Sequence, residues 1–293
     1  ARCVRDNRYL YIRNFMPHLG YNQRTFWPDL GEIRHEIYRL ADPVMMTAPQ
    51  WHFAGPSRPL EELYNRQSDP LNLHNLAGSK EHRDVQEKMR GELFRHIRDS
   101  RDLGFVPEAL AWEISKEKTL WELARSDGAY NQQRLVKAAS QVGQAEEQNF
   151  LTNLKHPDAG VRFWGAVGLT ASQSLTPRAV KALTAALSDT AIDVRIESAD
   201  ALARHGHTKE SIAVLAAALS DENLAAVQHA ARTIELLGDR AKSAVPAMKA
   251  CDLRMKKIRP PGTSPIVVEP DKDKAMWVLF STEVFLKRFD ETD

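Results

Sequence analysis

Residues favourable to β-structure are concentrated in the first fifteen positions of the chain. Within residues 9–15, Tyr9, Tyr11 and Phe15 alternate with Leu10 and Ile12, a pattern typical of strands. Asp6-Asn7 lies just before this run, and both residue types tolerate the positive φ angles of a tight turn. The pattern therefore predicts a β-hairpin with strands over residues 2–5 and 8–14.

The next stretch, residues 16–60, has little periodicity. One helix is predicted from Leu30 to Leu40, where Ile33 and Ile37 share a face with Leu40. Long irregular stretches are usually functional or disordered, and the aromatic residues here favour an ordered surface. These prolines and aromatics are Pro17, Tyr21, Phe26, Trp27, Pro28, Pro43, Pro49, Trp51, Phe53, Pro56 and Pro59.

Residues 61–130 have a helical pattern. Apolar side chains keep helical spacing from Val85 through Ile97, which predicts a helix that ends near Arg98. Gly104 is the expected left-handed residue beyond its end. A second helical stretch is predicted over residues 109–125.

From about residue 144 the sequence repeats itself. Leu154, Leu187 and Leu219 recur 33 and 32 residues apart, with matching apolar offsets after each. Such units are pairs of amphipathic helices that bury their apolar stripes only by stacking into a solenoid. Small side chains at Ala166, Ala199 and Ala231 would allow close helix approach, and a carboxylate would cap each second helix. The capping residues expected are Asp158, Asp189 and Asp221.

The chain closes with a predicted linker over residues 257–265 and an apolar helix from Ala275 to Phe289. Trp277, Phe280, Val284 and Leu286 are expected to cap the open end of the solenoid. The predicted fold class is therefore α+β followed by all-α: a small antiparallel sheet with helices, then an α-solenoid. The predicted divisions are residues 1–110, a helical connector at 111–143, and helical repeats at 144–293.

Composition narrows the function classes. The 293 residues are 43% hydrophobic and 27% charged, with a formal net charge of +1, which disfavours a nucleic-acid partner. The two cysteines exclude a disulfide framework and disfavour a zinc site, and no apolar run is long enough for a membrane span. Because Ala1 to Arg5 already have strand character, we expect a fragment or a chain that begins at a domain boundary.

The repeats resemble a known family. Asp158 to Leu169 contains Asp, Val-Arg, Ala and Leu at the spacing of short HEAT-like repeats of the phycobilisome-lyase type. The second repeat keeps Val-Arg, and the third has Val227 one place late. The resemblance implies a protein-binding or scaffolding solenoid.

Four segments in the first 110 residues, taken in order, resemble the C-terminal subdomain of sulfatases. The likeness is to the bacterial N-sulfoglucosamine-sulfohydrolase-like and arylsulfatase A-like branches. The segments are Val4 to Asn14, Arg58 to Pro70 with its Glu-Glu-Leu-Tyr core, Asn72 to Ala77, and Arg98 to Glu108 with Asp-Leu-Gly-Phe.

This resemblance implies hydrolysis of sulfate esters or N-sulfates on sulfated glycans, in the periplasm or outside the cell. Sulfatases use a formylglycine made within C/S-x-P-x-R, together with calcium. Ser57 to Glu61 is the nearest sequence here and ends in Glu instead of Arg. We therefore expect no catalytic or metal-binding residue in this chain. The formylglycine and calcium would belong to an upstream catalytic domain, which is also the expected partner.

Residues 18–27 are the predicted substrate-facing loop. Every cation before Lys80 is an arginine, whose planar group suits sulfate or carboxylate oxygens. Aromatic and amide side chains nearby suit sugar rings, although such residues also cover strand edges and fill loops. The predicted substrate-binding residues are His18, Asn22, Gln23, Arg24 and Trp27.

Two functions remain open from the sequence. The chain completes a sulfatase, or it is a non-catalytic interaction module whose solenoid binds a protein or a glycan. His205, His207 and His229 have no carboxylates at metal-binding spacing and are predicted to be surface residues.

Overall fold

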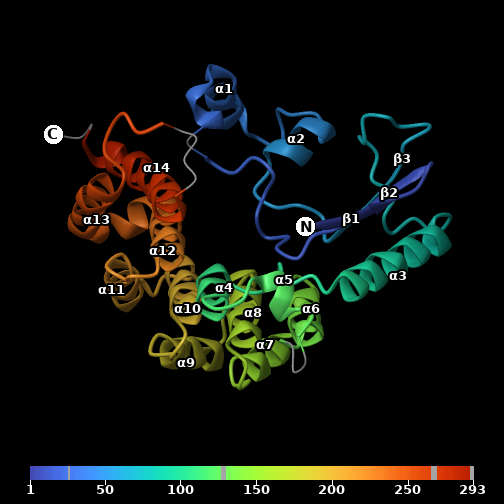
Figure 1. Cartoon of the computed structure of the whole chain (residues 1–293). Coiled ribbons are helices and arrows are strands. Elements are labelled where there is room, and N and C mark those ends of the chain that lie inside the picture. The colour runs from blue at the N-terminus through green and yellow to red at the C-terminus, as the bar shows by residue number, and fades with distance from the viewer. Residues whose placement is uncertain (26, 127–129, 265–268, 291–293) are drawn as a thin grey trace. The chain divides into compact units, whose positions relative to one another are not determined.

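The computed structural model contains one small sheet and many helices (Figure 1). It describes residues 1–25, 27–126, 130–264 and 269–290. The helices and strands group into two compact units. The sheet unit comprises residues 1–105 and 124–144, and the repeat unit comprises residues 106–123 and 145–293. The boundaries after residues 110 and 143 stay predictions, because this grouping does not test independent folding.

The sheet has three antiparallel strands in the order β1-β2-β3. β1 (Arg2–Arg5) and β2 (Tyr9–Arg13) form the predicted hairpin. The Asp6 carboxylate stabilises the turn by accepting the backbone N–H groups of Arg8 and Tyr9 at 2.8 and 2.6 Å. This prediction is confirmed.

The third strand, β3 (Glu61–Asn65), was predicted as part of a helical region, and that prediction is wrong for these five residues. β3 pairs with β2 along its whole length, from Tyr9 opposite Asn65 to Arg13 opposite Glu61. Leu63 is fully buried in this arrangement. A Glu-Glu-Leu sequence is compatible with a helix, so the strand arises from pairing with distant residues.

The helices of the sheet unit partly match the prediction. The helix expected at residues 30–40 is present as α1. The helix α2 was missed, although Pro49 falls in its first turn, where proline is well tolerated, and Gln50 accepts the Thr47 N–H at 2.9 Å. The elements are η1 (Pro28–Leu30), α1 (Glu32–Leu40), α2 (Ala48–Ala54), α3 (Arg83–Ser100) and α6 (Gln132–Gln141).

The end of α3 differs from the prediction. Arg101, with φ of 55°, is the left-handed residue that ends the helix, and Gly104 is not. Gly104 instead leaves room for an ion pair between β1 and the segment after α3. The Arg2 guanidinium binds the Asp102 carboxylate at 2.6 and 3.1 Å. A Cβ on Gly104 would lie 2.3 Å from Arg2 Nη2.

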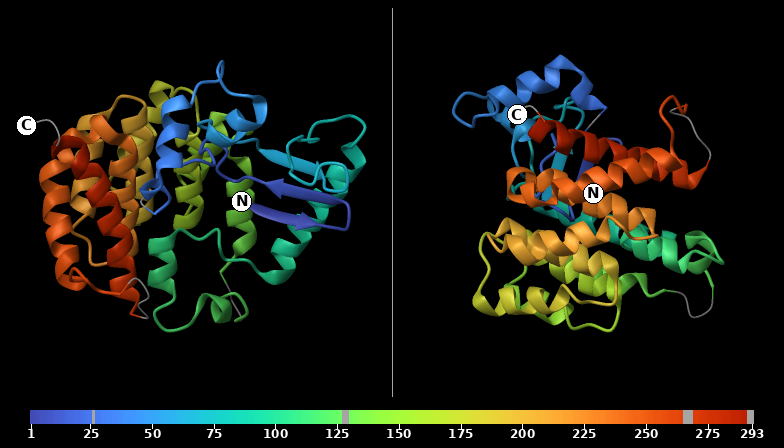
Figure 2. Two further views of the ribbon diagram at one scale, coloured as in Figure 1. Left: turned by 90° about the horizontal axis from the view of Figure 1, so that it is seen from above. Right: turned by 90° about the vertical axis from the view of Figure 1, so that its left-hand side faces the viewer.

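The repeat unit is all-helical, and its helices stack in successive layers (Figure 2). The three alanines at the repeated position, Ala166, Ala199 and Ala231, are fully buried, as predicted. The helices are α4 (Glu108–Ile114), α5 (Leu120–Leu123), α7 (Glu147–Asn153), α8 (Ala159–Thr170), α9 (Pro177–Ala186), α10 (Ile192–Arg204), α11 (Thr208–Ala218), α12 (Leu224–Leu237), η2 (Gly238–Ala244), α13 (Val245–Ile258) and α14 (Pro270–Asp290).

The repeated aspartates divide between two roles. Asp158 caps α8 as predicted, accepting the N–H groups of Gly160 and Val161. Asp189 and Asp221 lie before the capping residues of α10 and α12, so the capping prediction is wrong for them. Asp189 forms a two-pronged ion pair with Arg162 at 2.7 Å. This pair links two neighbouring repeats.

The final helix packs against α12 and α13 and belongs to the main core of the repeat unit. Its buried apolar side chains include Ala275, Val278 and Phe285. Of the predicted capping residues, Leu286 is partly buried and packs against this core, whereas Trp277 is 37% exposed. The linker predicted at residues 257–265 begins too early, because α13 continues to Ile258. Its last residue, 265, lies outside the described residues.

Candidate functional site

The two glutamates of the Glu-Glu-Leu-Tyr segment have separate partners. Glu61 accepts hydrogen bonds from Tyr11, from Gln86 at 2.6 Å, and from two nitrogens of Arg90, each at 2.6 Å. Burial favours the neutral acid, but the bonds from Arg90, Tyr11 and Gln86 outweigh burial and lower the pKa of Glu61 to about 2. Glu61 thus remains ionised and links β3 to β2 and α3.

Glu62 points to the other side of the strand and is almost completely buried. One carboxylate oxygen accepts Asn14 Nδ2 at 2.7 Å, and the other accepts the Tyr64 hydroxyl at 2.6 Å. The side chains around this carboxylate are Asn14, Tyr21, His52 and Tyr64. A buried carboxylate needs such partners, and here they join the strands to the loop at Tyr21 and to α2.

The other motif segments also hold the sheet unit together. Asn75 completes the open edge of β3: its Oδ1 accepts the Leu63 N–H at 2.9 Å, and its Nδ2 donates to the Glu61 carbonyl at 3.1 Å. In the Asp-Leu-Gly-Phe segment, the Phe105 ring lies under the Arg2 guanidinium at 5.0 Å. These motif segments therefore hold the sheet and α3 together, and none of the contacts described here positions a nucleophile.

The predicted substrate-binding residues divide between two surroundings. Gln23 and Arg24 lie toward α1: the Gln23 carbonyl accepts Arg34 Nη2, and the Arg24 guanidinium lies 4.4 Å from the Tyr38 ring centre. Trp27 is 49% exposed, and His18 is partly buried. Phe26, within the same predicted loop, lies outside the described residues. Their role in substrate binding stays a prediction.

Asn22 differs from its neighbours. Both polar atoms of its side-chain amide are buried, yet neither has a hydrogen-bond partner among the described residues. The preceding Tyr21 contacts Glu62, and its ring centre lies 5.2 Å from that of His52 with the two planes tilted by 43°. The same ring lies 5.3 Å from the Arg58 guanidinium. A buried amide without a partner is costly, so Asn22 is the strongest ligand-binding candidate of this loop.

The partners of Glu62 were not recognised from the sequence as one cluster. In the sequence, Tyr21 is only one of the aromatic residues of the irregular stretch, and Glu62 is only part of a motif. The adjacent Glu61 and Glu62 could have indicated the cluster, because glutamates at successive positions of a strand point to opposite faces of the sheet, and one of those faces is buried. That inference required the strand, which was predicted as helix.

In the repeat unit, α4 packs against α10 and α12. The Asp193 carboxylate on α10 accepts the Leu110 N–H at 2.8 Å, near the start of α4. Asn223, which caps α12, donates to the Ala109 carbonyl at 3.0 Å. The short helix is thus fixed by polar contacts to two repeats.

His229 corrects the prediction that it is a surface residue without carboxylate partners. Its side chain is 26% exposed and lies 3.5 Å from Asp193 and 3.6 Å from Glu197, both on α10. Burial lowers the pKa of the imidazole, but these two carboxylates outweigh burial and raise it to about 10. His229 is therefore a charged link between α12 and α10.

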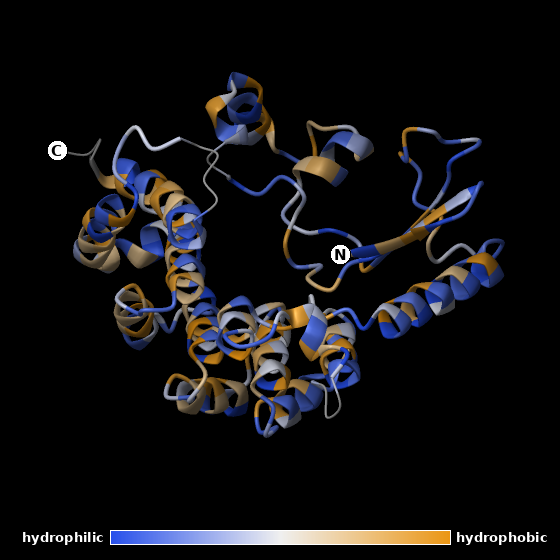
Figure 3. Ribbon diagram, in the orientation of Figure 1, coloured by the Kyte–Doolittle hydropathy of each residue, from blue (hydrophilic) through white to orange (hydrophobic). Residues whose placement is uncertain are grey.

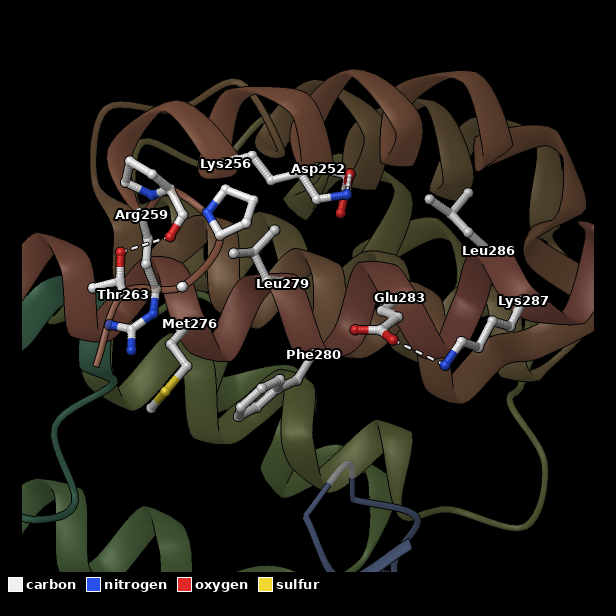
Figure 4. Close-up of a pocket in the computed structure, with 13 residues that line it drawn as sticks. Asp252, Lys256, Arg259, Thr263, Met276, Leu279, Phe280, Glu283, Leu286 and Lys287 are labelled. Atoms are coloured by element: carbon white, nitrogen blue, oxygen red, sulfur yellow. Dashed lines mark hydrogen bonds and ion pairs between the residues drawn. The ribbon is translucent and has the colours of Figure 1, made fainter. Parts of the chain in front are cut away.

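A groove of about 560 Å³ lies between α13 and α14 (Figure 4). Met276, Leu279 and Phe280 form an apolar side of it, while Lys256 and Lys287 are each paired with a carboxylate one helical turn earlier, Asp252 and Glu283. These two lysines are therefore neutralised, while Arg259, which also lines the groove, donates to the carbonyls of Lys272 and Ser264 at 3.1 and 2.6 Å.

Neither a metal centre nor a membrane span is found in the part of the chain that the structure describes. No group of three or more His, Cys, Asp or Glu side chains there is arranged to hold a metal ion. No helix there has the length and apolar character required to cross a bilayer.

Comparison with known proteins gives two partial matches. Residues 180–252 match the family model of HEAT repeats, in agreement with the predicted repeats. Two ulvan-active sulfatases of Formosa agariphila are each 32% identical to this chain, over 108 and 104 residues. These alignments cover 37% and 35% of this chain but only 18% of each sulfatase. No solved structure matches the chain significantly.

Proposed function

We propose that this chain is the C-terminal part of a sulfatase-like hydrolase that acts on sulfated glycans. Support comes from the 32% identity to ulvan-active sulfatases and from the contacts made by the motif residues. Those contacts preserve a sheet subdomain and include no nucleophile. In this proposal a preceding catalytic domain supplies the formylglycine and calcium, and the whole protein removes sulfate from a sugar.

The observation that carries the site proposal is the amide of Asn22, buried without a partner among the described residues. In our proposal Asn22 binds a sugar hydroxyl or sulfate oxygen, beside His18, Gln23, Arg24 and Trp27 of the same loop. The contacts of Tyr21 with Glu62 and His52 would hold the loop in position for this role.

The test uses residues 1–293 alone and joined to their upstream coding region, with release of sulfate from ulvan and from an aryl sulfate as the assay. We expect no calcium-dependent release by residues 1–293 and release by the longer protein. In the longer protein, Asn22→Ala should raise KM about tenfold, the effect of losing one good hydrogen bond to substrate. Asn7→Ala, in the exposed hairpin turn, is the control.

A longer protein without sulfatase activity would refute the proposed function. An Asn22→Ala variant with an unchanged KM would refute the role of the loop.

The alternative function is a non-catalytic interaction module. It is favoured by the match to HEAT repeats at residues 180–252, since solenoids commonly present an extended binding surface. A purified repeat-containing chain that retains a protein partner, while the longer protein releases no sulfate, would favour this alternative.

A further inference from the structure

The helix α1 of the sheet unit has its charged side covered and its apolar side exposed. Arg34 and Asp29 form an ion pair at 3.1 Å in which the side chains are only 18% and 15% exposed. Tyr38 donates to the same carboxylate at 2.7 Å. Ile33, in contrast, is 77% exposed. A surface helix usually buries its apolar stripe and exposes its charges, so the orientation of α1 is reversed.

The exposed apolar side chains belong to one surface, which we call the α1–α2 face. It comprises α1, α2 and the segment between them, and hydrophobic and hydrophilic residues follow one another along both helices (Figure 3). Between the helices this face is hollowed into a groove of about 530 Å³. Exposed apolar patches of several hundred Å² mark interaction sites. The apolar side chains that line the groove are Ile33, Ile37, Leu40, Met46, Phe53 and Ala54.

The two helices gain little stability from the rest of the sheet unit. None of their residues, all of which the structure describes, is buried. α1 has only nine residues, and a helix shorter than about 12 residues is marginal in water unless its apolar side is covered. The segment between the helices adds Val44 and Met45, which are 88% and 80% exposed. The α1–α2 face therefore has the character of an interface that a partner covers.

The charges beside the groove indicate which partner fits. Glu32 and Glu36 line the groove, and Arg39, in the last turn of α1, lies on the same flank of the apolar stripe. The ion pair between Arg39 and Glu36 is more than half exposed and is therefore weak and exchangeable. When two copies of such a helix lie antiparallel, residues of the same flank face each other. The acidic start of one copy then meets the basic end of the other.

We propose that the α1–α2 face joins two copies of this chain in a dimer with two-fold symmetry. In this dimer α1 of each copy lies in the groove of the other copy and runs antiparallel to its α1. Ile33, Ile37 and Leu40 become buried at the centre, and Glu32 of each copy faces Arg39 of the other. A two-fold interface uses the same patch twice, so a self-complementary patch suffices. The dimer does not depend on the proposed function, because it involves only the α1–α2 face.

The test is sedimentation equilibrium of residues 1–293 over a range of concentrations. We expect the apparent mass to rise toward twice the 33.1 kDa of one chain, with a dissociation constant on the order of micromolar. Ile33→Glu and Phe53→Glu should each weaken the dimer at least about a hundredfold, because the symmetry buries two unpaired carboxylates in each dimer. Leu71→Glu is the matched control, because Leu71 is 74% exposed in the loop after β3 and is not part of the groove lining.

A folding control accompanies these variants. Ile33 and Phe53 are exposed in the single chain, so their replacement should leave the fold of the monomer intact. Thermal unfolding at a concentration where the native chain is monomeric should therefore give equal midpoints. A weaker dimer with an unchanged midpoint separates loss of the interface from loss of the fold.

Charge reversal identifies the second copy and its orientation. Glu32→Arg brings two arginines together at each contact, and Arg39→Glu brings two glutamates together, so each variant alone should dimerise about tenfold more weakly. A mixture of the two variants should form a heterodimer about as stable as the native dimer. In that heterodimer both contacts again join opposite charges, which no other partner would restore.

A native chain that stays monomeric would refute the inference, as would a dimer that Ile33→Glu and Phe53→Glu leave unchanged, or a mixture without recovery. Binding to phosphatidylglycerol vesicles without dimerisation would assign the α1–α2 face to a membrane surface. Dimerisation of residues 1–293 but not of the longer protein would assign the face to the preceding part of that protein. Either of these results would also overturn the inference.

Discussion

Replacement of His229 tests whether a charged histidine stabilises the stacking of two repeats. In the folded chain its imidazole lies between Asp193 and Glu197, with a pKa of about 10 against 6.5 for an exposed histidine. At 1.36 kcal/mol per pH unit, this difference corresponds to at most about 5 kcal/mol. A quarter of the side chain is exposed, so water screens part of the interaction, and we expect a loss of about 2–4 kcal/mol in His229→Gln.

The assay is thermal unfolding followed by helical circular dichroism. For a unit of this size the loss corresponds to a midpoint about 4–16 °C lower. His207→Gln is the control, because His207 is exposed and its side chain does not cap α11. Both variants remove an imidazole from the repeat unit, so only the buried contacts of His229 distinguish them.

The pH dependence gives a second readout. Because the folded-state pKa lies above the unfolded one, the stabilisation is fully present below pH 6.5 and is lost as the pH rises through about 10. The difference between the native chain and His229→Gln should therefore be largest near pH 6 and small near pH 10.5. Equal midpoints at pH 6, or a difference unchanged between these pH values, would refute the reasoning.

Three further variants test contacts of the two units. Gly104→Ala places a Cβ 2.3 Å from Arg2 Nη2, so this variant should lower the free energy of unfolding by about 1–3 kcal/mol in urea titrations. Gly91→Ala is the control, because Gly91 has open space around it in α3, and this change should raise the free energy of unfolding by up to about 1 kcal/mol. Equal effects of the two variants would contradict the steric argument. A double-mutant cycle of Arg162→Gln and Asp189→Asn should give a coupling of about 1–3 kcal/mol, and additivity would exclude the inter-repeat ion pair. Glu61→Gln should lower the free energy of unfolding above pH 4.5, and the gap in stability between this variant and the native chain should narrow as the pH falls toward 2. A gap that does not change with pH would show that Glu61 is not held ionised.

The sequence predicts those parts of the fold that arise from short-range patterns. The hairpin follows from a run of β-favouring residues and a turn at Asp6-Asn7. The repeats follow from side chains that recur at a fixed interval, because each unit must bury its apolar stripe against the next. Three matching units also gave the correct positions of the buried alanines.

The errors concern contacts between residues far apart in the chain. β3 exists because it pairs with β2, some fifty residues away, and its own composition does not require a strand. His229 is 36 and 32 residues from its partners Asp193 and Glu197, about one repeat length, so no local spacing reveals the cluster. Likewise Arg101, and not the nearby glycine, ends α3, while Gly104 lies where Arg2 meets Asp102, a hundred residues away in the chain.

The substrate-binding role of the loop stays a prediction, and only the surroundings of its residues are known. The loop of residues 18–27 contains Asn22, whose amide lacks a partner among the described residues. The sequence could not distinguish Asn22 from Gln23, because burial and hydrogen bonding of an amide depend on the surrounding fold.

The course of the chain through the two units constrains how such a protein can be cut or recombined. The polypeptide leaves the sheet unit after residue 105, returns to it after residue 123, and leaves it again after residue 144. A single break at any of these three crossings leaves a segment of one unit covalently attached to the other. A recombination event that transferred only residues 145 onward would leave behind α4, together with the backbone groups that bind Asp193 and Asn223. Inheritance of the two units together would keep these contacts, whereas transfer of residues 145 onward alone would lose them.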